Sequence, residues 1–265
     1  MTTVPPTESG QPETPNDPRW LRRLRESFTS LAIQELATVG VRPGQRALDA
    51  AAGTGAVTAH LADLVGSDGS VVAVDTDTSQ LHPTPVIDVH QRDLTVDPLP
   101  GDPGTFDVIT ARCLLEHLPK RDVFHQMIGL LKPGGWLLLG EVTHLRTQVH
   151  KAPSAADVDL ITTVMDTLVD TITGVGKILH WSDFAPAELL ALGMRHVCAS
   201  QHTETWTGGG RGCALAAYTA RNLPGPLLAA GITPAEIEHF AELMANPAVL
   251  MRSIQFGGIH AQKTS

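Results

Sequence analysis

Short apolar runs alternate with amphipathic stretches along residues 45–145 of this chain. Ala47 and Leu48 predict a strand that ends at Asp49. Apolar residues then recur at a spacing near 3.6 over Val57–Val65, which predicts a helix. The continuous β-branched run Val71–Val74 is typical of a buried parallel strand and leads into Asp75. Alternating strands and helices predict a parallel sheet with right-handed crossovers.

The same reading extends along the rest of the chain. Five further strands are predicted, at Val86–His90, Phe106–Ala111, Trp136–Val142, Arg195–Trp206 and Ile254–Gln262. Helices are predicted at Trp20–Val39, Arg121–Leu131, Ala155–Ile172, Pro186–Leu192, Gly212–Arg221, Pro234–Ala245 and Pro247–Ser253, with Lys132–Gly135 as a tight turn into the fifth strand.

Five polar residues fall at the carboxyl ends of the predicted strands: Asp49, Asp75, Asp93, Arg112 and Glu141. Ligands of open parallel sheets bind above the carboxyl ends of the strands. The pattern therefore predicts one binding edge that gathers these side chains.

The loop after the first strand, Asp49–Gly55, indicates a nucleoside ligand. Gly53 and Gly55 let a ligand approach the main chain, and the helix that follows points unpaired N–H groups at it. Asp75 lies about 20 residues beyond, where an acid reads the ribose hydroxyls. A dinucleotide fingerprint would have a third glycine at position 58, where this chain has Thr58. Both S-adenosylmethionine and a nicotinamide or flavin dinucleotide stay open at this point.

Charge and composition narrow the class of partner. The formal net charge is −9 and aromatic residues make up 4% of the chain, which argues against a nucleic-acid surface. No apolar run approaches the length of a membrane span, and no secretory leader is visible, so a cytoplasmic enzyme is expected.

Five motifs in order give the chain a family resemblance. They are Ala47-Leu-Asp-Ala-Ala-Ala-Gly-Thr-Gly55, Val71-Val-Ala-Val-Asp75, Arg92-Asp-Leu94, the segment 106–118, and Leu130-Leu-Lys-Pro-Gly-Gly-Trp-Leu-Leu-Leu139. With them the chain resembles a class I S-adenosylmethionine-dependent methyltransferase and is especially similar to the natural-product methyltransferases common in actinobacteria. The resemblance implies an α/β fold with a Rossmann-like, mostly parallel seven-stranded sheet whose last strand is antiparallel, plus helical lid insertions.

The resemblance also implies roles for individual residues. Asp49 would serve the methionine end of the cofactor, Asp75 the ribose, and Asp93 the adenine amino group. The full implied set for S-adenosyl-L-methionine is Asp49, Ala51, Gly53, Gly55, Asp75, Thr76, Asp93, Leu94, Ala111 and Arg112.

Two departures from the family pattern stand out. Ala51 replaces the usual first glycine, and its methyl group is expected to fit if φ is negative. Residues 77–85 replace most of the usual second helix, because Pro83 and Pro85 would break a helix there.

The domain prediction is a disordered tail over residues 1–18 and a methyltransferase domain over residues 19–265. Residues 145–181 are interpreted as a helical lid on the substrate, with helical padding or a homodimer face as the alternative. A second helical excursion is expected around residues 211–253.

A general base is needed only if the acceptor must lose a proton. His144, after the fifth strand, and His180, at the end of the predicted lid, are the candidate catalytic residues. No histidine pair shows ligand spacing, so no metal is expected.

The sequence thus favours methyl transfer to a small molecule at O, N or C, in secondary-metabolite biosynthesis. Two alternatives remain: a protein of this fold that binds cofactor or ligand without transfer, and a nicotinamide-dependent oxidoreductase. Neither nucleic acid nor membrane is expected as a partner.

Overall fold

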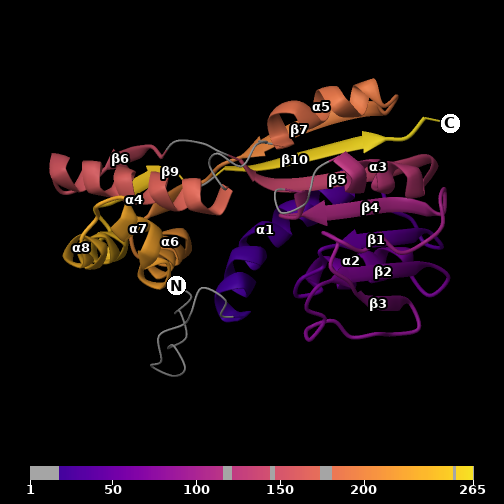
Figure 1. Cartoon of the computed structure of the whole chain (residues 1–265), viewed down its shortest axis with the longest axis horizontal. Helices are drawn as coiled ribbons and strands as arrows, with labels where there is room; N and C mark the ends of the chain where they lie inside the picture. The colour runs from indigo at the N-terminus through magenta and orange to yellow at the C-terminus, as the bar shows by residue number, and fades with distance from the viewer. Residues whose placement is uncertain (1–17, 116–120, 144–146, 174–180, 253–254, 265) are drawn as a thin grey trace. The chain divides into compact units, whose positions relative to one another are not determined.

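The computed structural model describes residues 18–115, 121–143, 147–173, 181–252 and 255–264 (Figure 1). The chain divides into two compact units. The larger, sheet-containing unit comprises residues 25–148, 169–205 and 252–265, and the smaller unit comprises residues 149–168 and 206–251 together with the segment that ends at Leu24.

A seven-stranded sheet organises the larger unit, in the order β3-β2-β1-β4-β5-β10-β7. β10 pairs antiparallel with both β5 and β7, and the neighbouring pairs from β3 to β5 are parallel. The predicted sheet is therefore confirmed. Its strands are β1 (Arg46–Ala50), β2 (Ser70–Asp75), β3 (Ile87–Gln91), β4 (Phe106–Arg112), β5 (Leu131–Thr143), β7 (Arg195–His202) and β10 (Gln255–Gln262).

Helices cover both faces of this sheet, which explains why its central strands are apolar on both sides. On one face Leu48 and Ile109 pack with Met127 of α3 (Arg121–Leu130) and Leu189 of α5 (Trp181–Ala191). On the other face Ala47, Val71 and Val108 pack against α1 (Pro18–Val39) and α2 (Ala56–Val65). Adjacent residues of β1 thus point to opposite cores.

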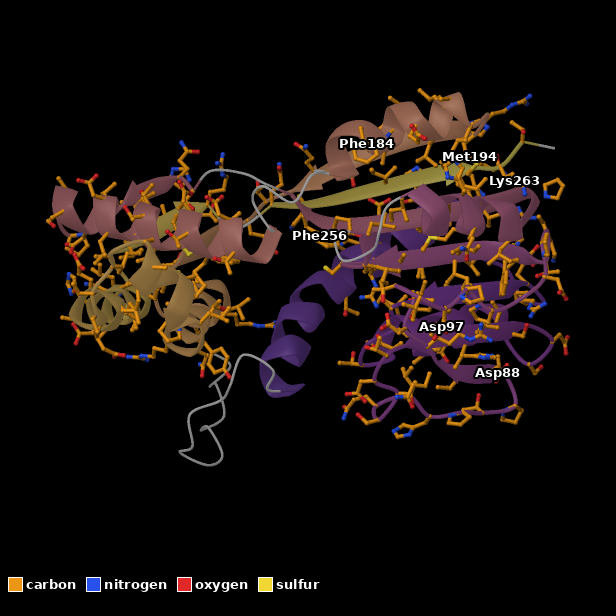
Figure 2. The ribbon with its side chains drawn as sticks, viewed as in Figure 1. Asp88, Asp97, Phe184, Met194, Phe256 and Lys263 are labelled. Atoms are coloured by element: carbon orange, nitrogen blue, oxygen red, sulfur yellow. The ribbon has the colours of Figure 1, made fainter. Side chains whose placement is uncertain are left out.

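The far edge of the sheet is tied down by α5, α1 and a lysine after β10. Phe184 on α5 and Met194 before β7, both labelled in Figure 2, join the core under α3. On α1, the Glu35 carboxylate accepts a hydrogen bond from Ser200 Oγ at 2.8 Å and lies 2.8 Å from His260 Nδ1. Lys263 Nζ donates to the carbonyls of Ile128, Gly129 and Leu131 at 2.7–3.5 Å and so caps the end of α3.

The smaller unit is mostly helical. It contains α6 (Arg211–Asn222), α7 (Pro224–Ala229), α8 (Pro234–Ala245), most of α4 (Ala155–Thr173), and the three-stranded sheet of β6 (Val149–Lys151), β9 (Leu250–Arg252) and β8 (Thr205–Thr207). Asp157 of α4 lies 2.8 Å from His239 Nε2 of α8, which joins these two helices. The segments predicted as lid and helical excursion supply most of this unit.

Several predicted elements differ from those observed. The helix expected at Pro247–Ser253 is wrong: residues 250–252 form β9, which pairs with β6 some hundred residues away. α7 and β6 were not predicted. The strand predicted at Arg195–Trp206 is divided, because β7 ends at His202 and Thr205–Thr207 form β8 in the three-stranded sheet. α5 begins at Trp181, so Pro186 lies inside it instead of starting it. The turn predicted at 132–135 lies within β5 and coincides with a shift of register, because Phe106 pairs with Leu131 but Val108 pairs with Trp136.

The connection between β2 and β3 contains no helix, as the two prolines in residues 76–86 predicted. Among the described helices none is long and apolar enough to cross a membrane.

Candidate functional site

The carboxyl ends of the parallel strands bring the predicted polar residues to one edge of the sheet. Register places Asp75 opposite Gln91, Ala50 opposite Ala111, and Arg112 opposite Gly140. Ala51 and Asp75 therefore lie at adjacent strand ends, with Arg112 on the other side of β1. The convergence predicted from the sequence is confirmed.

The loop between β1 and α2 is built from left-handed residues. Ala51, Gly53 and Gly55 have φ values of 60°, 58° and 77°. The Ala52 N–H donates to the Val74 carbonyl at 3.0 Å, which holds the loop against β2. A side chain at Gly55 would meet Leu81 Cδ2 at 2.9 Å. The left-handed φ values favour glycine at positions 53 and 55, and at Gly55 a side chain would also displace the end of Leu81.

Ala51 does not have the negative φ under which its methyl group was expected to fit. Its φ of 60° lies in the region that favours glycine. The sharp change of direction from strand to helix imposes this conformation, whichever residue occupies the position. The alanine side chain is therefore held at a strain of about 1–2 kcal/mol.

Asp75 connects the glycine loop to the end of β2. Its Oδ2 accepts a hydrogen bond from the Gly53 N–H at 2.7 Å. Its Oδ1 accepts from the Asp77 N–H at 3.1 Å and from Thr76 Oγ1 at 3.4 Å. Oδ1 thus accepts two hydrogen bonds and Oδ2 accepts one, so Asp75 keeps one further acceptor site, on Oδ2, for a ligand while it orders the loop.

Asp49 is a fully buried carboxylate beneath the same loop. Its Oδ2 accepts a hydrogen bond from Thr58 Oγ1 at 2.7 Å, whereas Oδ1 has no hydrogen-bond partner in the described part of the chain. Burial raises the pKa of Asp49, and the negative charge of Asp75 adds to that rise. The positive charge of Arg112 and the hydrogen bond from Thr58 act in the opposite direction.

Arg112 ends β4 beside Asp49 and is half-buried. Its Nε is buried and has no hydrogen-bond partner among the described residues. Two groups of opposite charge on adjacent strands therefore each keep a buried polar atom unpaired. Unpaired buried polar atoms are rare in folded proteins and call for a partner such as a ligand or ordered water.

Two of the residues predicted for the cofactor, Asp93 on the adenine side and Thr76, are more exposed than Asp49 and Asp75. Asp93 is exposed, and its Oδ1 accepts from Thr95 Oγ1 at 2.6 Å and from the Thr95 N–H at 2.9 Å. These bonds lower the pKa of Asp93. Leu94 is buried with the core residues of the α3 face. Thr76 is exposed next to Asp75.

Ala111 and Glu141 lie at this edge, but both are buried within the protein. Ala111 is fully buried in β4. Glu141 is also buried, and its Oε1 accepts hydrogen bonds from the N–H groups of Leu114 and Leu115 at 3.2 and 3.0 Å. Glu141 thus fixes the start of the segment after β4.

Three residues of the site were not predicted. Thr58 serves Asp49, Asp77 serves Asp75, and Thr95 serves Asp93; each partner lies two to nine residues downstream of its acid. A Ser or Thr soon after a strand-ending acid is the signal that could have found Thr58 and Thr95, whereas Asp77 donates its backbone N–H, which its side chain does not reveal. The candidate bases His144 and His180 lie outside the described residues. The described residues contain no group of three metal-ligating side chains.

The edge of the sheet just described lies within the part of the chain that resembles a known family. Residues 47–135 match the family model for a methyltransferase domain. The ubiquinone/menaquinone biosynthesis C-methyltransferase of Vibrio parahaemolyticus is 38% identical over 130 residues, which cover 46% of this chain and 48% of that protein. Methyltransferase str3 of Strobilurus tenacellus is 32% identical over 145 residues, 52% of each chain. The chain spans about half the length of these curated relatives.

Solved structures share the fold over most of the chain. Phosphoethanolamine N-methyltransferase 2 of Haemonchus contortus, in complex with phosphomonomethylethanolamine and S-adenosylhomocysteine, aligns with a TM-score of 0.53 and 15% identity, over 93% of this chain and 53% of that one. The YcgJ protein of Bacillus subtilis aligns with a TM-score of 0.52 and 16% identity, over 91% and 99%. At these identities the likeness concerns the fold.

Proposed function

We propose, from the match of residues 47–135 to the family model for a methyltransferase domain, that this chain is a class I S-adenosylmethionine-dependent enzyme that transfers a methyl group to a small-molecule acceptor. The observation that carries the proposal is the row of ligand-binding groups at one sheet edge. Asp75, the left-handed glycine loop, Asp49 and Arg112 lie at neighbouring strand ends.

The residues present fit the methyl donor at both of its ends. Asp75 would bind the ribose by accepting from a hydroxyl at the remaining site of Oδ2, and Asp93 would accept from the adenine amino group. Asp49 Oδ1 and Arg112 Nε are unpaired and buried, of opposite charge, and match the ammonium and carboxylate of an amino acid. Gly53 and Gly55 leave the main chain open to the ligand.

When bound, S-adenosylmethionine supplies an already activated methyl group on a sulfonium. The chain's own contribution is then to hold the reactants in line and to exclude water. The rigid loop, anchored by the Gly53–Asp75 and Ala52–Val74 hydrogen bonds, provides fixed contacts on one side of the reaction. His144 and His180 stay candidate bases for an acceptor that must lose a proton.

A small-molecule acceptor is supported by the charge of the chain and by its relatives. The net charge of −9 disfavours a polyanionic acceptor such as nucleic acid. The name of one curated relative refers to ubiquinone and menaquinone biosynthesis, which supports a small-molecule acceptor. Transfer to O, N or C, a role in secondary metabolism, a cytoplasmic location, a homodimer and a lid over residues 145–181 stay predictions.

Calorimetric titration with S-adenosylhomocysteine tests the cofactor assignment. The unmodified chain is expected to bind, and Asp75→Ala is expected to bind about 1.5–3 kcal/mol more weakly because charge-assisted hydrogen bonds are lost. Asp88→Ala is the matched control, since the Asp88 side chain is 71% exposed on the neighbouring strand β3. Equal affinity of Asp75→Ala and the unmodified chain would refute the ribose assignment.

A second experiment tests transfer itself. Incubation with S-adenosylmethionine and a panel of phenols, amines and activated carbon acids is followed by mass spectrometry for the gain of one methylene unit. His144→Gln and His180→Gln are compared over a range of pH on any acceptor that reacts. If the cofactor binds but no acceptor gains mass, the alternative of binding without transfer is favoured.

A further inference from the structure

Thr58 is the only residue among those described that donates a side-chain hydrogen bond to the buried Asp49. Its Oγ1 lies 2.7 Å from Asp49 Oδ2, and its own side chain is buried. Asp49 Oδ1 has no partner in the described residues. The hydroxyl thus occupies one carboxylate oxygen and leaves the other available.

The position of Thr58 in α2 directs its hydroxyl outward from the helix. Threonines deeper in the helices bond to the carbonyl four residues back, as do Thr38, Thr162 and Thr219. Thr58 is the third residue of α2, and the residue four before it lies outside the helix. Its hydroxyl therefore turns to Asp49 at the end of β1.

The N-terminus of α2 adds a favourable environment for a negative charge. The N-cap residue Gly55 supplies no side-chain hydrogen bond to the first turn of α2. The Thr58 N–H as well as its hydroxyl lowers the pKa of Asp49, against the larger effect of burial. A carboxylate at this place complements the helix dipole.

We propose that Thr58 is a positioning residue for the methyl donor: its hydroxyl holds Asp49 Oδ2 and keeps Oδ1 for the ammonium group of the donor's amino-acid end. The inference rests on the proposed function and deepens it. Thr58, which stands where a dinucleotide fingerprint has a glycine, would then help to bind S-adenosylmethionine.

Thr58→Val, which keeps the shape and removes the hydroxyl, tests the proposal. S-adenosylhomocysteine carries the amino-acid end, whereas 5′-methylthioadenosine shares the adenosine and sulfur but lacks that end. Thr58→Val is expected to raise the Kd for S-adenosylhomocysteine about tenfold and to leave the Kd for methylthioadenosine unchanged. Thr58→Ser, which restores the hydroxyl, is expected to recover the affinity.

The pH dependence of the S-adenosylhomocysteine affinity distinguishes this role of Thr58 from a purely structural one. Without the hydrogen bond from the Thr58 hydroxyl the Asp49 carboxyl is protonated more readily, and the neutral acid cannot pair with an ammonium group. The affinity ratio between the unmodified chain and Thr58→Val for S-adenosylhomocysteine is therefore expected to grow as pH falls.

The controls separate this inference from its premise. Thr219→Val removes the hydroxyl of another buried helical threonine and is expected to leave both affinities unchanged. If Thr58→Val fails to fold, Thr58→Ala takes its place. If Thr58→Val leaves the affinity for S-adenosylhomocysteine unchanged, or weakens the binding of both ligands equally, the role of Thr58 is refuted and the proposed function is not affected. Failure of the unmodified chain to bind S-adenosylhomocysteine would overturn the proposed function and this inference with it.

Discussion

Ala51 offers the sharpest test of how the loop conformation is maintained. Its φ of 60° is that of a glycine, so Ala51→Gly removes a strain of about 1–2 kcal/mol. The glycine also raises the conformational entropy of the unfolded chain, which lowers stability by about 0.4–1 kcal/mol. Loss of a half-buried methyl group costs about 0.4 kcal/mol more, half the value for a buried methylene. Ala51→Gly is therefore expected to stabilise the chain by about 0.5 kcal/mol.

The neighbouring alanine provides the matched control. Ala52 is 1% exposed, and its φ is not positive. Ala52→Gly thus relieves no strain and loses both a buried methyl group and unfolded-state order, so it is expected to destabilise by about 1.5 kcal/mol. The two variants should differ by about 2 kcal/mol, with opposite signs relative to the unmodified chain.

Urea titration followed by tryptophan fluorescence measures this difference, because Trp136 lies in the same sheet. The unfolding free energies are compared at equal m values, so that only stability changes are read. If Ala51→Gly lowers stability as much as Ala52→Gly does, the loop does not hold Ala51 in a left-handed conformation and the strain argument is refuted.

Three further predictions concern stability away from the loop. Lys263→Met removes the contacts of Nζ to two carbonyls at the end of α3 and to the carbonyl of Leu131 at the start of β5, and it is expected to lower the unfolding free energy by about 1–2 kcal/mol; an unchanged urea midpoint would contradict the cap. The hydrogen bond that the Asp157 carboxylate accepts from His239 Nε2 raises the pKa of His239 above its ordinary value of 6.5. The stability gained from this pair is therefore complete below that pH and is lost as pH rises through the higher, folded value. Melting of the unmodified chain and of His239→Gln from pH 6 to 9 checks this; a gap between them that did not narrow with rising pH would count against it. Gly212→Ala is expected to destabilise the smaller unit by about 1–3 kcal/mol, because its methyl group would overlap the Trp206 ring; thermal unfolding equal to that of the unmodified chain would exclude the overlap.

The local pattern of apolar and polar residues was sufficient to predict the strands of the larger unit and the edge of its sheet where the candidate ligand-binding groups lie. The apolar runs that end in Asp49 and Asp75 are buried on both faces, so each strand is marked by its own residues and needs no distant partner to be recognised. Because parallel strands share one carboxyl edge, the order of the elements also placed the candidate ligand groups together. The absence of a helix before β3 followed from Pro83 and Pro85 in the same way.

Distant pairing decided what local pattern could not. Residues 250–252 were predicted as helix but form a strand, because their partners at 149–151 supply the hydrogen bonds. The φ of Ala51 depends on the turn between a strand and a helix that are both packed elsewhere, and an alanine alone gives no sign of it. Thr58 illustrates what each source decides. The sequence showed a threonine where a dinucleotide fingerprint has a glycine. Only the fold brought its hydroxyl to the buried carboxylate of Asp49, since that contact joins β1 and α2 across the loop.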